Sequence, residues 1–116
     1  MRFSKTDNIY KIIRITGSQD NILGISFVEK NSIGDNIEVI EWNFPKSDKS
    51  RIRTSKKDVL EQVLSGLESV NQSLGTNYKL SQIYFSPFDS GTNSVYTLLI
   101  CNLIRHYHDG KEFNEI

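Results

Sequence analysis

Residues 80–110 have the sequence LSQIYFSPFDSGTNSVYTLLICNLIRHYHDG, and this stretch contains the clearest indications of the fold. Residues 80–86 predict a short buried strand, because Ile83 and Phe85 alternate onto one face and Pro87 stops the run. The polar residues that follow predict a turn. This part of the chain is therefore expected to join a buried strand to a long apolar segment.

The long apolar segment, Val95–His108, predicts a helix. It is apolar on nearly every side as far as Arg105, so the helix should be buried on more than one side, with Cys101 as an inert buried thiol. Gly110 is expected to end the helix, and the last six residues are expected to fray. A strand over residues 95–101 is the alternative, since the β-branched and aromatic residues at its start suit a sheet.

A second helix is predicted upstream, because apolar side chains recur there at helical spacing. They are Val59, Leu60, Val63, Leu64, Leu67, Val70 and Leu74. Ser55 with Asp58 resembles a capping box at the start of this helix, and Gly75 lies where a left-handed cap ends a helix. Gly66 in the middle weakens the helix by roughly 1 kcal/mol relative to alanine, so tertiary packing must offset that cost.

Three strands are predicted before this helix, over residues 9–16, 22–29 and 36–44. The first two are joined by a polar turn. The third changes its phase of alternation, which indicates either burial on both faces or a β-bulge near Val39 and Ile40. Burial on both faces is favoured, because Glu38 and Glu41 can then lie at partly open positions.

The predicted architecture is a single α+β domain over residues 1–116, with the element order β-β-β-α-β-α. The first three strands form an antiparallel meander, and the first helix makes a right-handed crossover. The fourth strand then pairs in parallel with the first strand. This arrangement gives a four-stranded mixed sheet of order 3-2-1-4 packed with two helices.

Composition limits the possible functions. The chain has 116 residues, enough for one domain with its own core, and its single cysteine excludes an internal disulfide. Fourteen basic side chains balance fourteen acidic ones, so nucleic-acid binding through bulk charge is not expected. The N-terminus lacks the apolar core of a signal peptide, and the longest apolar run is about half the length of a membrane span. We therefore expect a cytoplasmic protein without a membrane segment.

The predicted element order resembles the opening of ribonuclease H-like domains, which implies a metal-dependent nuclease as one alternative. The resemblance places Glu61 on the first helix and Asp89 after the fourth strand. The first strand, however, carries Lys11 and Arg14 where a carboxylate is needed, and these cations repel metal ions. No catalytic residue is therefore assigned. The alternative is a nuclease-like or phosphate-handling enzyme that uses Glu61, Asp89, His106 and His108.

A His-x-His-Asp sequence lies at the end of the last predicted helix. On a strand, His106 and His108 face the same way and form a metal pair, whereas on a helix they are about 200° apart. A polar helix end therefore explains them better, and no metal ligand or cofactor is assigned. Residues 89–94 precede a helix N-terminus, where backbone amides bind anions, but an N-capping turn explains the same residues.

Residues 46–57 predict a polar linker that carries six cations and one acid. A solvated linker is favoured, and a nucleic-acid accessory protein that contacts phosphates through residues 46–57 is the further alternative. Residues 58–116, in contrast, contain seven acids and three lysines or arginines. Charge is thus segregated along a neutral chain, which suits recognition of a charged partner.

In size, in its single domain and in its sided charge, the chain is similar to immunity proteins of bacterial polymorphic and contact-dependent growth-inhibition toxins. This resemblance implies a non-catalytic binding protein that neutralises a cognate toxin in a tight one-to-one complex. The expected contact residues are Asp35, Glu38, Glu41, His106, His108 and Asp109. The sequence leaves the toxin's activity and the oligomeric state of this protein open.

Overall fold

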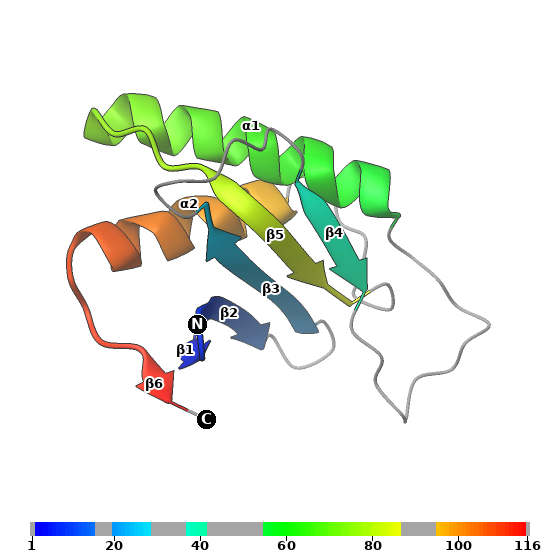
Figure 1. Cartoon of the computed structure of the whole chain (residues 1–116), viewed down its shortest axis with the longest axis horizontal. Coiled ribbons are helices and arrows are strands. Elements are labelled where there is room, and N and C mark those ends of the chain that lie inside the picture. The colour runs from blue at the N-terminus through cyan, green and yellow to red at the C-terminus, as the bar shows by residue number, and fades with distance from the viewer. Residues whose placement is uncertain (1, 16–19, 29–36, 42–54, 87–94, 116) are drawn as a thin grey trace.

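The computed structural model describes residues 2–15, 20–28, 37–41, 55–86 and 95–115. These residues form a mixed sheet and two helices, which confirms the α+β class (Figure 1). The elements are β1 (Arg2–Thr6), β2 (Ile9–Ile15), β3 (Asp20–Phe27), β4 (Glu38–Glu41), α1 (Lys56–Leu74), β5 (Leu80–Phe85), α2 (Val95–His108) and β6 (Asn114–Glu115).

The strand order of the sheet is β4-β5-β3-β2-β1-β6, so the predicted four-stranded order 3-2-1-4 is wrong. The strand over residues 80–85 does not pair with β2. It lies between β3 and β4, antiparallel to the first and parallel to the second. The physical reason is that α1 connects β4 to its immediate parallel neighbour, while the other edge of β2 is occupied by β1. The predicted meander therefore ends at β3.

Two strands, β1 and β6, were not expected from the sequence. β1 folds back on β2 through a two-residue turn in which Asp7 has a φ of 54°, a conformation that aspartate tolerates better than most residues. The predicted fraying of the last six residues is wrong, because β6 pairs in parallel with β1. A ring on the segment before β6, Phe113, packs against the core and holds this segment in place.

The strand β4 agrees with the expectation of burial on both faces. Its four residues pair with β5 without a break in register, so no bulge lies between Val39 and Ile40. These two side chains are half-buried and lie on opposite faces, whereas Glu38 and Glu41 are exposed. The other residues of the predicted strand, 36 and 42–44, lie outside the described residues.

Both helices pack on one face of the sheet. The core side chains of the sheet share that face in the observed register, as in the row formed by Ile12, Leu23 and Phe85. The buried stripe of α1 covers this face beside α2, and Val63 and Leu99 are each fully buried there. Leu64 belongs to the predicted stripe but lies at its edge and is 41% exposed.

The predicted ends of α1 are confirmed. Ser55 Oγ accepts a hydrogen bond from the backbone N–H of Asp58 at 3.2 Å, and Gly75 ends the helix with a φ of 68°. The segment Val95–His108 is a helix, so the alternative strand over residues 95–101 is excluded. Gly110 ends it in the left-handed conformation as predicted. Neither described helix is both long and apolar enough to cross a membrane.

The two helices run in the same direction and approach most closely at Gly66. Thr97 Oγ1 donates a hydrogen bond to the carbonyl of Gln62 at 2.9 Å, and one turn later Cys101 Sγ lies 3.4 Å from the carbonyl of Gly66. A methyl group at position 66 would contact Ile100 and would lie 2.8 Å from the carbonyl oxygen of Thr97. The glycine therefore sets the spacing of the helices.

Candidate partner-binding surface

α1 and α2 end on the same side of the molecule (Figure 1). There, aromatic and histidine side chains from the end of α2 and from the segments packed against it contact one another. We call this group the aromatic end. Its members are Phe3, Tyr10, Phe27, Tyr78, His106, Tyr107, His108 and Phe113. They come from six separate segments, and they include three of the five tyrosines and three of the six phenylalanines of the chain, so more than half of these residues meet at one end.

Tyr107 lies at the centre of the aromatic end. Its ring centroid is 5.0 Å from that of Tyr10, 4.6 Å from that of Phe27 and 5.7 Å from that of Tyr78. These distances and the tilted or edge-to-face angles are those of favourable aromatic pairs, each contributing about 0.5–1.5 kcal/mol beyond its buried area. The group is therefore a packed, ordered surface.

His106 connects the aromatic end to the C-terminal segment. Its ring stacks on Phe3 with centroids 3.7 Å apart and meets Phe113 edge to face at 4.7 Å. Nε2 lies 2.7 Å from the carbonyl oxygen of Glu112. Because a carbonyl only accepts, Nε2 carries the proton in this contact. The imidazole thus holds the segment that leads to β6.

Polar atoms of the aromatic end lie among its rings. The Tyr78 hydroxyl is 2.9 Å from His108 Nδ1, and Lys5 Nζ lies 5.0 Å from the ring centroid of Tyr10. Burial raises the pKa of the Tyr107 hydroxyl, neighbouring Tyr10 and Tyr78 raise it further, and Lys5 offsets part of this effect. The Tyr107 hydroxyl therefore stays neutral at physiological pH and can both donate and accept hydrogen bonds.

The aromatic end is partly open to solvent. Seven of its eight side chains are half-buried, and His108 is exposed. Rings with polar tips that remain accessible are typical of surfaces that bind other proteins, where tyrosine is enriched among the residues that contribute most to affinity. The arrangement suits recognition, since it offers apolar area together with a few hydrogen-bonding groups.

The structure brings together three of the six expected contact residues. Three of them lie at the aromatic end, because they are at the C-terminal end of α2: His106, His108 and Asp109. Glu38 and Glu41 lie on β4, with β5, β3 and β2 between that strand and β1, and their side chains are on opposite faces. Glu38 accepts a hydrogen bond from Gln82 at 3.3 Å. Asp35 lies outside the described residues.

The groups named for the enzyme alternative do not converge where they are described. His106 and His108 contact different partners and point apart, as helical geometry predicts. Glu61 is next to Gln62, and Gln62 forms hydrogen bonds with the first turn of α2. His106 lies about 14 Å further along that helix, so it is far from Glu61. No group of three or more His, Cys, Asp or Glu side chains among the described residues can hold a metal ion. Asp89 and the rest of the turn 89–94 lie outside those residues.

Two further expectations concern the thiol and the basic linker. Cys101 is half-buried rather than fully buried, and burial raises the pKa of its thiol while Arg105 lowers it in part. An inert, protonated thiol agrees with this environment. Of the linker 46–57, only residues 55–57 are described, and Lys56 and Lys57 are exposed in the first turn of α1.

Sequence reasoning missed every aromatic member of this surface. The missed residues are Phe3, Tyr10, Phe27, Tyr78, Tyr107 and Phe113. Their shared signal is their position near the ends of strands or helices, but no spacing in the chain shows that these ends meet. The sequence matches no protein-family model, and comparisons with curated proteins and with solved structures found no match.

Proposed function

We propose that this protein is a non-catalytic binding protein that recognises a protein partner through the aromatic end. The observation that carries the proposal is the convergence of eight aromatic and histidine side chains, from six segments, on one partly exposed surface. An apolar surface of this kind reduces solubility unless a partner covers it, and tyrosine-rich surfaces are common in protein recognition.

The packing of the aromatic end favours tight binding. Tyrosine and phenylalanine have few rotatable bonds, and here each ring is already held by its neighbours. Binding of a partner therefore costs little conformational entropy in these side chains, which favours high affinity. The exposed polar groups at the end of α2, His108 and Asp109, lie at the rim and can set the orientation of the partner.

The partner that we propose is the toxin domain of a bacterial growth-inhibition system, with this chain as its cytoplasmic immunity protein. Support comes from the small size, the segregation of charge along the chain and the resemblance to immunity proteins in general character. Glu38 and Glu41 would join the contact only if the partner extended from the aromatic end to the far edge of the sheet. The aromatic end is thus the primary contact in this proposal.

The test is a binding and rescue experiment with the C-terminal toxin domain encoded next to this gene. We expect the wild-type protein to bind that domain and to restore growth of cells that produce it. Tyr107→Ala and Asp109→Lys should each weaken binding at least tenfold, which corresponds to about 1.4 kcal/mol. Leu98→Ser is the matched control, because Leu98 is on the same helix, is 45% exposed and lies outside the aromatic end.

Calorimetry or biolayer interferometry measures the affinities, and circular dichroism checks that each variant is folded. Absence of both binding and rescue by the wild-type protein would contradict the proposed function. Binding that is unchanged in Tyr107→Ala and Asp109→Lys but reduced in Leu98→Ser would place the contact elsewhere. Tyr107→Phe tests the contribution of the hydroxyl alone, because it removes that group and keeps the ring packed in the aromatic end.

A further inference from the structure

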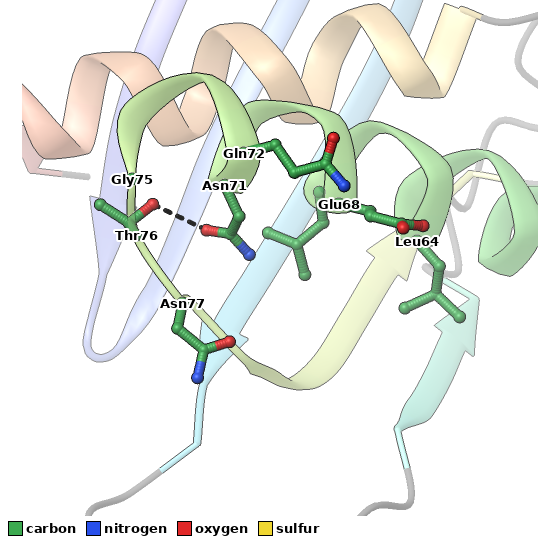
Figure 2. A pocket seen from close by; sticks show the side chains of 8 residues that line it. Leu64, Glu68, Asn71, Gln72, Gly75, Thr76 and Asn77 are labelled. Carbon is green, nitrogen blue, oxygen red and sulfur yellow. Dashed lines mark hydrogen bonds between the residues drawn. The ribbon is translucent and has the colours of Figure 1, made fainter.

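A groove lies between the second half of α1 and the segment that leads into β5. It consists of two adjoining pockets of about 630 and 140 Å³ that share Leu64 and Leu67. Figure 2 shows the larger pocket between the second half of α1 and the turn that begins at Gly75. The smaller pocket continues to Tyr78 and Leu80 at the start of β5. We call the two together the α1 groove.

The floor of the α1 groove is apolar and accessible. Leu64 is one of two large apolar side chains that are exposed in the described part of the chain, and Leu67, which is 6% exposed, lines the same pockets. Leu80, nearly buried, extends the floor in the smaller pocket. An exposed leucine beside further apolar area is suited to receive an apolar side chain of a partner.

The end wall of the groove is rigid. Asn71 Oδ1 accepts a hydrogen bond from Thr76 Oγ1 at 2.8 Å (Figure 2). It also accepts one from the Tyr78 backbone N–H at 3.0 Å, and Asn71 Nδ2 donates to the Tyr78 carbonyl at 3.1 Å. One side chain thus fixes the turn between α1 and β5. A wall that is already ordered costs a ligand little conformational entropy.

The charge along the helical rim indicates which partner fits. Glu61, Leu64 and Glu68 are spaced by three and four residues, so they lie on one side of α1, and all three are exposed. Figure 2 shows Glu68 beside Leu64 at the mouth of the larger pocket. On the opposite rim, the charged side chain among the described lining residues is Lys79. An apolar floor with acids along the helix complements an apolar side chain flanked by lysine or arginine.

We propose that the α1 groove binds a basic amphipathic segment of the protein partner, with one leucine- or phenylalanine-sized side chain seated over Leu64 and Leu67 and a cation facing Glu61 and Glu68. The inference rests on the proposed function, since it assigns the chemistry of the partner. Tyr78 lines the groove and also belongs to the aromatic end. One partner can therefore cover both surfaces without a gap.

The first test uses the full chain and synthetic peptides, without any toxin. A twelve-residue peptide of leucine and lysine at helical spacing is titrated into isotope-labelled protein, and amide chemical shifts are recorded. We expect saturable shifts confined to residues 60–80 and to Val28 and Ile37, which also line the smaller pocket. A peptide with glutamate in place of lysine, and one with serine in place of leucine, should each bind at least fivefold more weakly. Equal binding of all three peptides, shifts elsewhere or no shifts would overturn the inference.

The second test uses variants of the groove. Leu64→Ser and Glu68→Lys should each reduce binding of the basic peptide, and of the neighbouring toxin domain, at least fivefold. Ser69→Lys is the matched control, because it introduces a lysine at an exposed position of the same helix that lines neither pocket. If the toxin domain binds both groove variants as tightly as wild type, the inference fails and the proposed function stands. If the basic peptide binds but the toxin domain does not, the proposed function fails, and the groove is still a binding site for basic amphipathic segments.

Discussion

At the scale of single residues, Gly66 shows how a position can be misjudged from local propensity alone. In the sequence it is only a weak point of a helix. In the structure it allows α2 to approach until the carbonyl of Gly66 meets Cys101 and that of Gln62 meets Thr97. The absent side chain is thus a requirement of the packing between the helices.

We predict that Gly66→Ala lowers the free energy of unfolding by about 1–3 kcal/mol, although alanine favours a helix. The added methyl group has no room beside Ile100 and the backbone of Thr97. Chemical denaturation monitored by circular dichroism measures the change. Ser65→Ala, one residue earlier and exposed, is the control and should change stability by less than about 0.5 kcal/mol. A more stable Gly66→Ala protein would show that the helices can separate without cost.

At the scale of elements, the C-terminal segment is held by side chains rather than by its strand. β6 has two residues paired with β1, too few to be stable alone. The rings around it supply the remaining contacts, since Phe113 meets Phe3, Tyr10 and His106. A helix cap contributes as well, because the Lys111 N–H binds the carbonyl of His106 beyond Gly110.

We predict that Phe113→Ala releases this segment and lowers the free energy of unfolding by about 1–3 kcal/mol, below the loss for a fully buried phenylalanine because Phe113 is half-buried. Hydrogen exchange should show faster exchange of the amides in β6, and denaturation gives the stability. Lys111→Ala serves as the control, because that side chain is exposed. Unchanged exchange would mean that the strand pairing suffices by itself.

At the scale of the whole molecule, the exposed lysines of the linker and the aromatic end lie far apart. The net charge is zero, so any attraction for a polyanion must come from a local group of cations. Among the described residues of the linker, Lys56 and Lys57 are solvent-exposed at the start of α1, while the aromatic end lies at the opposite end of that helix. A protein partner at the aromatic end would leave these lysines uncovered.

We predict that the protein does not bind a 20-base-pair DNA or RNA duplex at physiological salt, because its fourteen acidic side chains balance its fourteen basic ones and leave no net positive charge to attract a polyanion. Fluorescence anisotropy between 50 and 150 mM salt is the measurement. The control replaces Lys49, Arg51, Arg53, Lys56 and Lys57 with glutamine. Binding by the wild-type chain that this control abolishes would instead support a nucleic-acid accessory protein.

The predictable part of the fold was local. Both helices, the caps at Ser55, Gly75 and Gly110, and the strands at residues 9–15 and 80–85 could be located from spacing and capping. β1 was missed because its alternation is weak and a positive φ at Asp7 has no firm sequence signal. Of the candidate surface, the sequence indicated only His106 and the polar rim, His108 and Asp109, because charged and titratable residues indicate function where aromatic ones indicate core.

The sequence by itself determined the two helices, their caps and the strands at residues 9–15 and 80–85, because periodicity and capping depend on residues within a turn or two of one another. Only the tertiary structure decided that β5 lies between β3 and β4, since strand order depends on packing between residues far apart in the chain. The same reason applies to the aromatic end and the α1 groove. Each is assembled from side chains of several elements, and they meet because α1 and α2 run in parallel and end together over the sheet.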